Sequence, residues 1–202
     1  MLFDSLDKLP SVSVDDSSRF TLGNENILIS GKQQEISLET IQLLSGFTSA
    51  IKTGTESICL DNPVSYTKYP FASKLFFKLE DDGLEVNQLQ FISQDKSGIT
   101  LLYSIRNVDK SSKNIQIQFQ ATTDLKPSIL MDSTFESNSA DRIIFEELTG
   151  IFTAKDEANN WFAVWGTSTE FAVSPTNIAC AIEEAELGAS AGFEISYLFG
   201  LG

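Results

Sequence analysis

The acidic side chains are the residues of this chain whose types and spacing could support chemistry. Two carboxylates about 5–10 Å apart across a cleft can hydrolyse a glycosidic bond. Neighbouring residues in a strand point to opposite faces, so two adjacent acids do not form that arrangement by themselves. We therefore assign no catalytic residue. We expect solvated turns and strand faces at the acidic clusters, which are Asp81-Asp82, Glu146-Glu147, Asp156-Glu157 and Glu183-Glu184 with Glu186.

Metal and nucleophile chemistry have little support in the residue types. The chain contains no histidine, which removes the usual general base near neutral pH and the commonest transition-metal ligand. A Ser-His-Asp or Cys-His hydrolase is therefore excluded for this chain by itself. The stretch Asp156–Asn160 offers oxygen ligands of the kind that calcium prefers, but it lacks the spacing and the glycine of an EF-hand loop. We expect a plain hairpin turn there, and we predict no metal site and no cofactor.

Four aromatic residues are the candidate contacts for a carbohydrate or for another domain. Trp161 and Trp165 fall on one face of an expected strand, where two indole rings could stack on sugar rings or fill the space between two sheets. We favour packing in the core or at a domain interface for this pair. Tyr66 and Tyr69 lie in a loop bounded by prolines, so we expect them to be more exposed and open to a ligand or a partner.

Composition bounds the partners and the compartment. The 28 acids and 14 bases among 202 residues give a formal net charge of −14, which argues against nucleic acid and anionic membranes as partners. No apolar run approaches the roughly 20 residues of a membrane span, and the N-terminus is unlike a signal peptide. We expect a soluble cytoplasmic protein. Cys59 and Cys180 are expected to be reduced core residues, with a disulfide as the alternative.

The elements that must position these residues are β-strands. The stretch Gly98–Ala121 contains two runs of period-two alternation around a polar segment, which predicts a β-hairpin with one buried and one solvated face. Its second run places Gln116, Gln118 and Gln120 on the solvated face. Turn signals recur along the whole chain without a long helical window. We therefore predict an all-β fold, a large antiparallel β-sandwich.

Shorter patterns refine this prediction. Residues 19–31 are typical of a first hairpin, and residues 32–54 are predicted to be extended, although a short helix is the alternative there. Within residues 84–93 the apolar positions shift from even to odd numbers, which predicts a β-bulge or a corner. Pro127 is expected to end a strand. Residues 177–186 are predicted to form a further strand.

The domain organisation is predicted to be simple. Residues 1–18 are polar and are expected to form a loose N-terminal lead-in. Residues 19–202 are expected to form a single β-sandwich domain, because no linker or exact repeat divides them. The chain ends directly after an apolar strand, which we interpret as a cut at a domain boundary of a longer chain.

Four segments, taken in order, carry a resemblance: LGNENILISG, SGFTSAIKTG, LLYSIRNVDKSSKNIQIQFQATTDLKPSIL and GIFTAKDEANNWFAVWGTS. Over most of its length the chain resembles the N-terminal β-supersandwich domain that precedes the (α/α)6-barrel in bacterial and archaeal glucoamylase-like and glycogen-debranching-like glycoside hydrolases. In those domains a hairpin is followed by an Asp-Leu-basic-Pro segment, matched here by Asp124, Leu125, Lys126 and Pro127. A strand that ends in an aromatic residue and a glycine is matched by Trp165-Gly166.

The resemblance implies a supporting role rather than a catalytic one. In such enzymes the catalytic carboxylates belong to the barrel, so the resemblance assigns no catalytic residue to this chain. It implies a non-catalytic domain of an α-glucan-acting glycoside hydrolase, with the C-terminal barrel of the same polypeptide as its partner and α-glucan as a further candidate. The alternatives are a stand-alone carbohydrate-binding module and a structural β-sandwich protein without enzymatic context.

Overall fold

The computed structural model is built from β-strands, which confirms the predicted all-β fold. It describes residue 6 and residues 8–14, 21–25, 27–31, 34–38, 41–93, 97–109, 111–127, 139–169, 172–174, 180 and 187–199. Within these ranges, sixteen strands form three sheets, which we name A, B and C, and every pairing between strands is antiparallel.

The three sheets differ in size and in the order of their strands. Sheet A has the order β1 (Val12–Val14), β7 (Ser65–Lys68), β8 (Ala72–Leu79), β9 (Leu84–Ile92) and β10 (Ile99–Asn107). Sheet B has the order β15 (Ala172–Ser174), β16 (Ser190–Phe199), β11 (Lys113–Pro127), β5 (Ile41–Thr53), β4 (Glu35–Leu38), β3 (Ile27–Ser30) and β2 (Thr21–Gly23), and β6 (Glu56–Cys59) also pairs with β5. Sheet C has the order β12 (Asp141–Glu146), β13 (Ile151–Asp156) and β14 (Phe162–Gly166).

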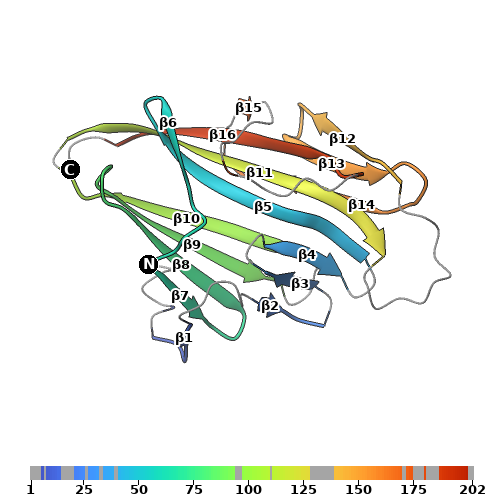
Figure 1. The fold of residues 1–202 in the computed structure, drawn as a ribbon, viewed down its shortest axis with the longest axis horizontal. Helices are drawn as coiled ribbons and strands as arrows, with labels where there is room; N and C mark the ends of the chain where they lie inside the picture. The colour runs from blue at the N-terminus through green and yellow to red at the C-terminus, as the bar shows by residue number, and fades with distance from the viewer. Residues whose placement is uncertain are drawn as a thin grey trace.

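A hydrophobic core fills the space between sheets A and B. In Figure 1 the long strands β5, β11 and β16 form one layer above β7 to β10. The inward side chains Ile51 of β5, Val86 of β9 and Ile115 of β11 are at most 1% exposed. The hydroxyl groups of Ser49 in β5 and Tyr103 in β10 lie 2.5 Å apart and form a hydrogen bond between the two layers. The predicted antiparallel β-sandwich is therefore confirmed.

The predicted hairpin at Gly98–Ala121 is wrong in its pairing, although both of its strands exist. β10 pairs with β9 in sheet A, whereas β11 pairs with β5 and β16 in sheet B. The chain therefore passes from one layer to the other between these two strands (Figure 1). Apolar side chains of both strands pack in the same core. Their alternation is thus the one that a hairpin would show, which is why the sequence pattern did not separate the two arrangements.

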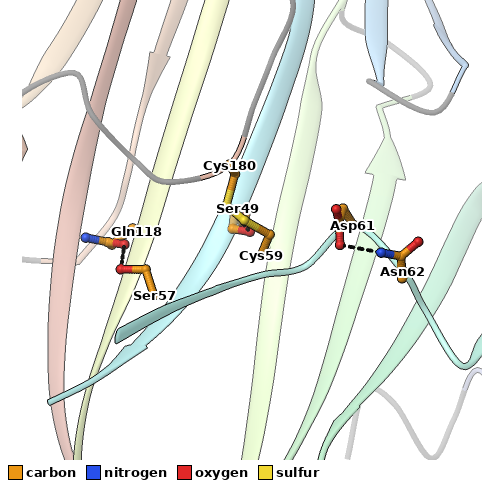
Figure 2. Close-up of a disulfide and its surroundings, with 7 residues drawn as sticks. All are labelled: Ser49, Ser57, Cys59, Asp61, Asn62, Gln118 and Cys180. Carbon is orange, nitrogen blue, oxygen red and sulfur yellow. Dashed lines mark hydrogen bonds between the residues drawn. A yellow bond between two sulfur atoms is a disulfide. The ribbon is translucent and has the colours of Figure 1, made fainter. Parts of the chain in front are cut away.

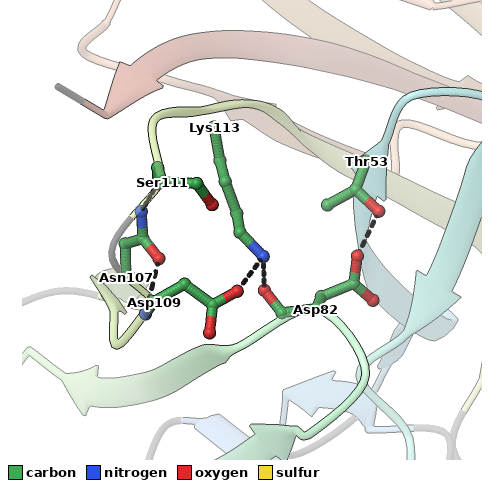
Figure 3. A network of polar contacts seen from close by, with 6 residues as sticks. All are labelled: Thr53, Asp82, Asn107, Asp109, Ser111 and Lys113. Atoms are coloured by element: carbon green, nitrogen blue, oxygen red, sulfur yellow. Dashed lines mark hydrogen bonds and ion pairs between the residues drawn. The ribbon is translucent and has the colours of Figure 1, made fainter. Parts of the chain in front are cut away.

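A network of polar contacts holds this passage between the layers (Figure 3). Lys113, at the start of β11, forms an ion pair of 2.6 Å with Asp109 and donates a hydrogen bond to the backbone carbonyl of Asp82. The carboxylate of Asp82 in turn accepts a hydrogen bond of 2.6 Å from the hydroxyl of Thr53, at the end of β5. The acidic turn between β8 and β9 therefore anchors the crossing by its contacts with both layers.

The glutamine face of β11 is buried at Gln118 and Gln120 and half-buried at Gln116, which corrects the second part of the hairpin prediction. Gln118 and Gln120 are only 5% and 9% exposed. The side chain of Gln118 accepts a hydrogen bond of 2.9 Å from Ser57 of β6 and donates one of 2.5 Å to Glu194 of β16. Neighbouring strands thus supply polar partners, which allows amide groups to be buried without a large desolvation cost.

Strand β9 contains no bulge, so the prediction from its shift in apolar phase is wrong. Its register with β8 and β10 is continuous from end to end. The shift arises because both faces of β9 are covered near its C-terminal end. Leu89 and Phe91 pack into a second, smaller cluster with Leu6, Tyr69 and Ala72. A strand that is buried on both faces has no single apolar phase.

Most other expectations for single elements agree with the structure. β2 and β3 form the first hairpin, and the Asn24 carboxamide caps its turn by accepting a hydrogen bond of 2.9 Å from the amide of Ile27. The range 32–54 contains the strands β4 and β5 rather than a helix, and β11 ends at Pro127. The range 1–18 differs from the expected loose lead-in, because it contributes β1, which pairs with β7, and the buried side chain of Leu6. Apart from Cys180, the strand expected at 177–186 lies outside the described residues.

Sheet C is a small unit placed at one end of the sandwich. In Figure 1 its strands β12 and β13 lie above β11 and β16, at the upper right. All three of its strands contact β11, and β14 also contacts β5. The register between β11 and β5 shifts beyond Thr122, in the region where sheet C joins. Such irregularities increase the local twist and bend a strand, so β11 can serve both sheet B and sheet C.

Candidate functional site

The two tyrosines expected in an exposed loop are buried. Tyr66 lies in β7 and Tyr69 directly follows it, and each is 3% exposed. Burial raises the pKa of the Tyr66 hydroxyl to about 12, and a hydrogen bond with Ser73 opposes this shift. The expectation of exposure is wrong because the paired strands β7 and β8 replace the loop. The position of both rings in the core leaves no stacking surface for a sugar ring there.

The two tryptophans share one face, as the alternation predicts, and that face points inward. Trp161 and Trp165 are both partly buried and pack against the main core. The indole of Trp165 stacks on the ring of Phe152 in β13, with 5.6 Å between centroids and 8° between planes. Its Nε1 atom is buried without a hydrogen-bond partner among the described residues. The pair thus acts here as packing between sheet C and the sandwich.

Three aspartates lie near one another where β11 meets sheet C. Among the described acidic residues, they are the best candidates for a chemical site. Asp124 of β11 is 5% exposed and forms an ion pair with Lys126. Asp141 of β12 accepts a hydrogen bond of 3.0 Å from the backbone amide of Leu125. Asp156 of β13 is fully buried. Asp124 and Asp156 both act electrostatically on Asp141.

The environments of Asp141 and Asp156 move their pKa values in opposite directions. Burial raises the pKa of Asp141, and the nearby carboxylates of Asp156 and Asp124 add to this, against hydrogen bonds from Thr123 and Leu125. Burial would also raise the pKa of Asp156. Hydrogen bonds from Ser139 and Asn159 outweigh it, so the pKa of Asp156 is lowered. Two carboxyl groups with separated pKa values can divide acid and base roles only if a substrate can reach both.

Asp156 is committed to folding rather than to catalysis. Its Oδ1 atom accepts hydrogen bonds from the backbone amides of Ala158 and Asn159, at 3.0 and 2.6 Å, and from the Asn159 carboxamide at 2.8 Å. Its Oδ2 atom accepts one of 3.1 Å from the amide of Ser139. The carboxylate therefore organises the turn between β13 and β14, and the structure places a hairpin turn where the sequence left calcium as an alternative.

The acidic clusters Asp81-Asp82 and Glu146-Glu147 lie at turns. Asp81-Asp82 occupies the turn between β8 and β9, and Glu146 accepts a hydrogen bond of 3.0 Å from the Thr149 hydroxyl in the turn after β12. The cluster Glu183-Glu184 with Glu186 lies outside the described residues. Within the described residues, no group of three or more acidic, cysteine or histidine side chains could hold a metal ion.

Cys59 and Cys180 form a disulfide, which corrects the expectation that they are reduced (Figure 2). Cys59 is the last residue of β6, and Cys180 lies 121 positions later in the chain. Both sulfur-bearing residues pack against Ala50 of β5. The covalent bond therefore joins two distant segments over the same face of sheet B.

Sequence reasoning missed one surface feature, which we name the outer face of sheet C. It consists of the side chains of β12, β13 and β14 that point away from the core, with a central row formed by Ile144, Thr153 and Val164. Ile144 and Val164 are 55% and 54% exposed, and Phe162 beside them is 63% exposed. The available signal was that β12 and β14 carry apolar residues on both faces, whereas the exposed face of an antiparallel sheet is usually polar.

Comparison with known proteins assigns no family to this chain. Neither a scan against protein-family models nor a search of curated proteins finds a match to the sequence.

In the part of the chain that the structure describes, none of the helices is of the length and apolar character needed to cross a membrane.

Proposed function

We propose that this β-sandwich is a non-catalytic domain of an α-glucan-acting glycoside hydrolase, in which it packs on a catalytic (α/α)6-barrel of the same polypeptide. The proposal begins from the resemblance of four sequence segments to the domain that precedes such barrels. The all-β sandwich fold agrees with it. The barrel supplies the catalytic carboxylates in this proposal, and the sandwich supports it.

The contact between the two strands that end in the most distinctive matched segments is the observation that carries the proposal. The segment Asp124–Pro127 ends β11, and Trp165-Gly166 ends β14. These strands contact one another, and Leu125 and Trp165 belong to the same hydrophobic cluster. The two strands that carry these segments thus pack in one core. This supports the view that the matched segments belong to one structural unit rather than to unrelated strands.

The absence of a catalytic assignment follows from how the described carboxylates are used. Asp156 accepts three hydrogen bonds from its own turn and one from the amide of Ser139, and Asp124 is paired with Lys126. A general acid or base must reach a substrate proton within hydrogen-bond distance. Carboxylates that are buried and saturated by internal donors do not meet this requirement, so we propose that the isolated chain does not hydrolyse glucans.

A cytoplasmic location is part of the same proposal, and the disulfide is the observation against it. Reducing systems keep most cytosolic thiols reduced. The charge of −14 is the basis for proposing that neither nucleic acid nor an anionic membrane is a partner. The redox state of Cys59 in source cells decides the location, and a fully oxidised pool would contradict the cytoplasm.

The mass of the native gene product tests the proposed function. An antibody raised against this chain should detect a product that exceeds 22.2 kDa by some hundreds of residues. The product captured by that antibody should release sugar from glycogen or from maltooligosaccharides, whereas the isolated chain should release none. A native product of 22.2 kDa would contradict the proposal, and so would a longer product without activity on α-glucans.

A further inference from the structure

The outer face of sheet C has an apolar centre that the described residues leave uncovered. Ile144 and Val164 flank Thr153 across the three strands, in direct register. Both aliphatic side chains are more than half exposed. Exposed apolar side chains grouped on a sheet face that is usually polar are typical of a surface for interaction with another molecule.

Charged residues lie at the two ends of this apolar centre and have opposite signs. Arg142 and Glu146 are both exposed residues of β12 and point to the same face as Ile144, which lies midway between them. Because a strand rises by about 3.4 Å per residue, the two charges are roughly 14 Å apart. No ion pair within the described part of the chain involves Arg142. The face therefore has a positive end and a negative end.

A surface with this pattern is complementary to itself. A two-fold axis that lies in the plane of the contact and runs across the strands reverses the strand direction of a second copy. It would place Ile144 on Ile144 and Val164 on Val164 of the second copy. It would also place each Arg142 opposite the Glu146 of the other copy, so the contact contains two charge pairs of opposite sign. Contacts between identical surfaces of this kind are the rule in symmetric dimers.

The third strand fits the same arrangement. Phe162 and Gly166 lie at opposite ends of β14 and are both exposed on the outer face. The two-fold axis would set each Phe162 ring opposite the Gly166 of the second copy, where no side chain occupies the space. Lys155 of β13 would lie opposite Ile151, whose apolar surface suits the aliphatic stem of a lysine.

We propose that the outer face of sheet C is the contact surface of a homodimer, in which a second copy of this chain packs face to face with its strands reversed. A second copy suits the surface better than an acidic foreign partner, because such a partner would leave Glu146 opposite like charge. The inference does not depend on the proposed function, since it rests only on the register and exposure of β12, β13 and β14.

The size of the face sets the strength of the dimer. Three strands about 4.8 Å apart, of six, six and five residues, present roughly 300 Å² per copy. Specific stable complexes bury about 800 Å² per partner, so this contact is a small one. The net charge of −14 on each copy adds a repulsion that salt screens only in part. We therefore expect a reversible dimer with a dissociation constant of roughly 0.1–1 mM.

Sedimentation equilibrium with charge-reversed variants tests the proposal. The unaltered 202-residue chain should show a monomer–dimer equilibrium at physiological salt. Arg142→Glu and Glu146→Arg should each weaken dimerisation by at least tenfold, because each places like charges opposite one another. An equimolar mixture of the two variants should dimerise as well as the unaltered chain, and so should the double variant. Lys68→Glu, at an exposed position of β7 in sheet A, is the matched control and should change nothing.

Each outcome of the sedimentation experiment either supports or overturns the proposed homodimer. All substituted side chains are exposed, so the urea midpoint of each variant should match that of the unaltered chain. A chain that stays monomeric up to the highest concentration overturns the proposal. A dimer that tolerates both single reversals overturns it as well. If the single variants lost dimerisation and their mixture did not recover it, Arg142 and Glu146 would not pair between copies. That result would also overturn the two-fold arrangement.

Discussion

At the scale of single residues, the aspartates of the junction between β11 and sheet C show how the fold assigns opposite roles to one residue type. Asp156 accepts hydrogen bonds that favour its charged form. Burial by itself would raise the pKa of Asp156, but these hydrogen bonds outweigh burial and lower it. Asp141 is dominated by burial and by neighbouring carboxylates, so its pKa is raised. The first side chain stabilises the folded state when it is ionised, and the second costs stability when it is ionised.

This difference predicts opposite responses to amide substitution. The contribution of Asp156 is present above its unfolded pKa of about 3.9 and is lost as the pH falls through its lower folded pKa. Asp156→Asn should therefore reduce the free energy of unfolding at pH 7 by about 1–3 kcal/mol, because a donor group would face the Ser139 amide. The loss should shrink in acid. Asp141→Asn should be at least as stable as the unaltered chain at pH 7, and its advantage should vanish as the pH falls below the raised pKa of Asp141.

Urea unfolding of both variants at pH 7 and near pH 3 measures this prediction. The unaltered chain serves as the reference at each pH, since net charge alone changes stability with pH. If Asp141→Asn and Asp156→Asn lowered the free energy of unfolding at pH 7 by similar amounts, the separate roles of Asp141 and Asp156 would be contradicted.

At the scale of secondary-structure elements, the pairing of β16 with β11 depends on a close approach of their backbones. Gly192 of β16 pairs in register with Gln120. A Cβ atom at Gly192 would overlap with the backbone carbonyl oxygen of Phe119, which is part of the neighbouring strand and not the end of a flexible side chain. The glycine is therefore required by the distance between the strands.

Gly192→Ala should reduce the free energy of unfolding by about 1–3 kcal/mol, the usual cost of overpacking in a well-packed region. Gly98→Ala is the matched control, because a Cβ atom there has no heavy atom within 4 Å. The control should be neutral or slightly stabilising, since alanine restricts the unfolded chain. Equal stability of the two variants in urea would show that β16 lies farther from β11 than the structure indicates.

At the scale of the whole molecule, the disulfide joins elements that the backbone connects only through a long detour. Cys59 and Cys180 are 121 positions apart, so the bond closes a loop that includes β7 to β15 and with them most of sheet A and all of sheet C. In the chain-entropy model, such a cross-link stabilises the fold mainly by restricting the unfolded chain.

Removal of the disulfide should lower the free energy of unfolding by about 2–4 kcal/mol. The measurement is urea unfolding of the unaltered chain with and without a thiol reductant. The double substitution Cys59→Ser with Cys180→Ser is the control, because the reductant should leave its midpoint unchanged. An identical midpoint for the oxidised and reduced chains would mean that the bond adds no stability.

Part of the fold and little of the candidate site were open to prediction from sequence. The alternation of Ile115 and Ile117 with Gln116 and Gln118 identified a strand and its core-facing side. The same pattern did not reveal that the glutamine face is covered, because burial there depends on partners from β6 and β16. Periodicity placed the two tryptophans on one face of a strand, whereas the burial of Tyr66 depends on its pairing in β7.

The sequence by itself determined the all-β class, the location of most strands and, for strands such as β11, the face that carries the apolar core residues. These follow from side-chain order along a single strand, which is a local property. Only the tertiary structure decided that β10 and β11 belong to different layers, that Cys59 meets Cys180, and that sheet C leaves an apolar face uncovered. Backbone hydrogen bonds between distant strands make those choices, and the groups that form them are the same in every residue except proline.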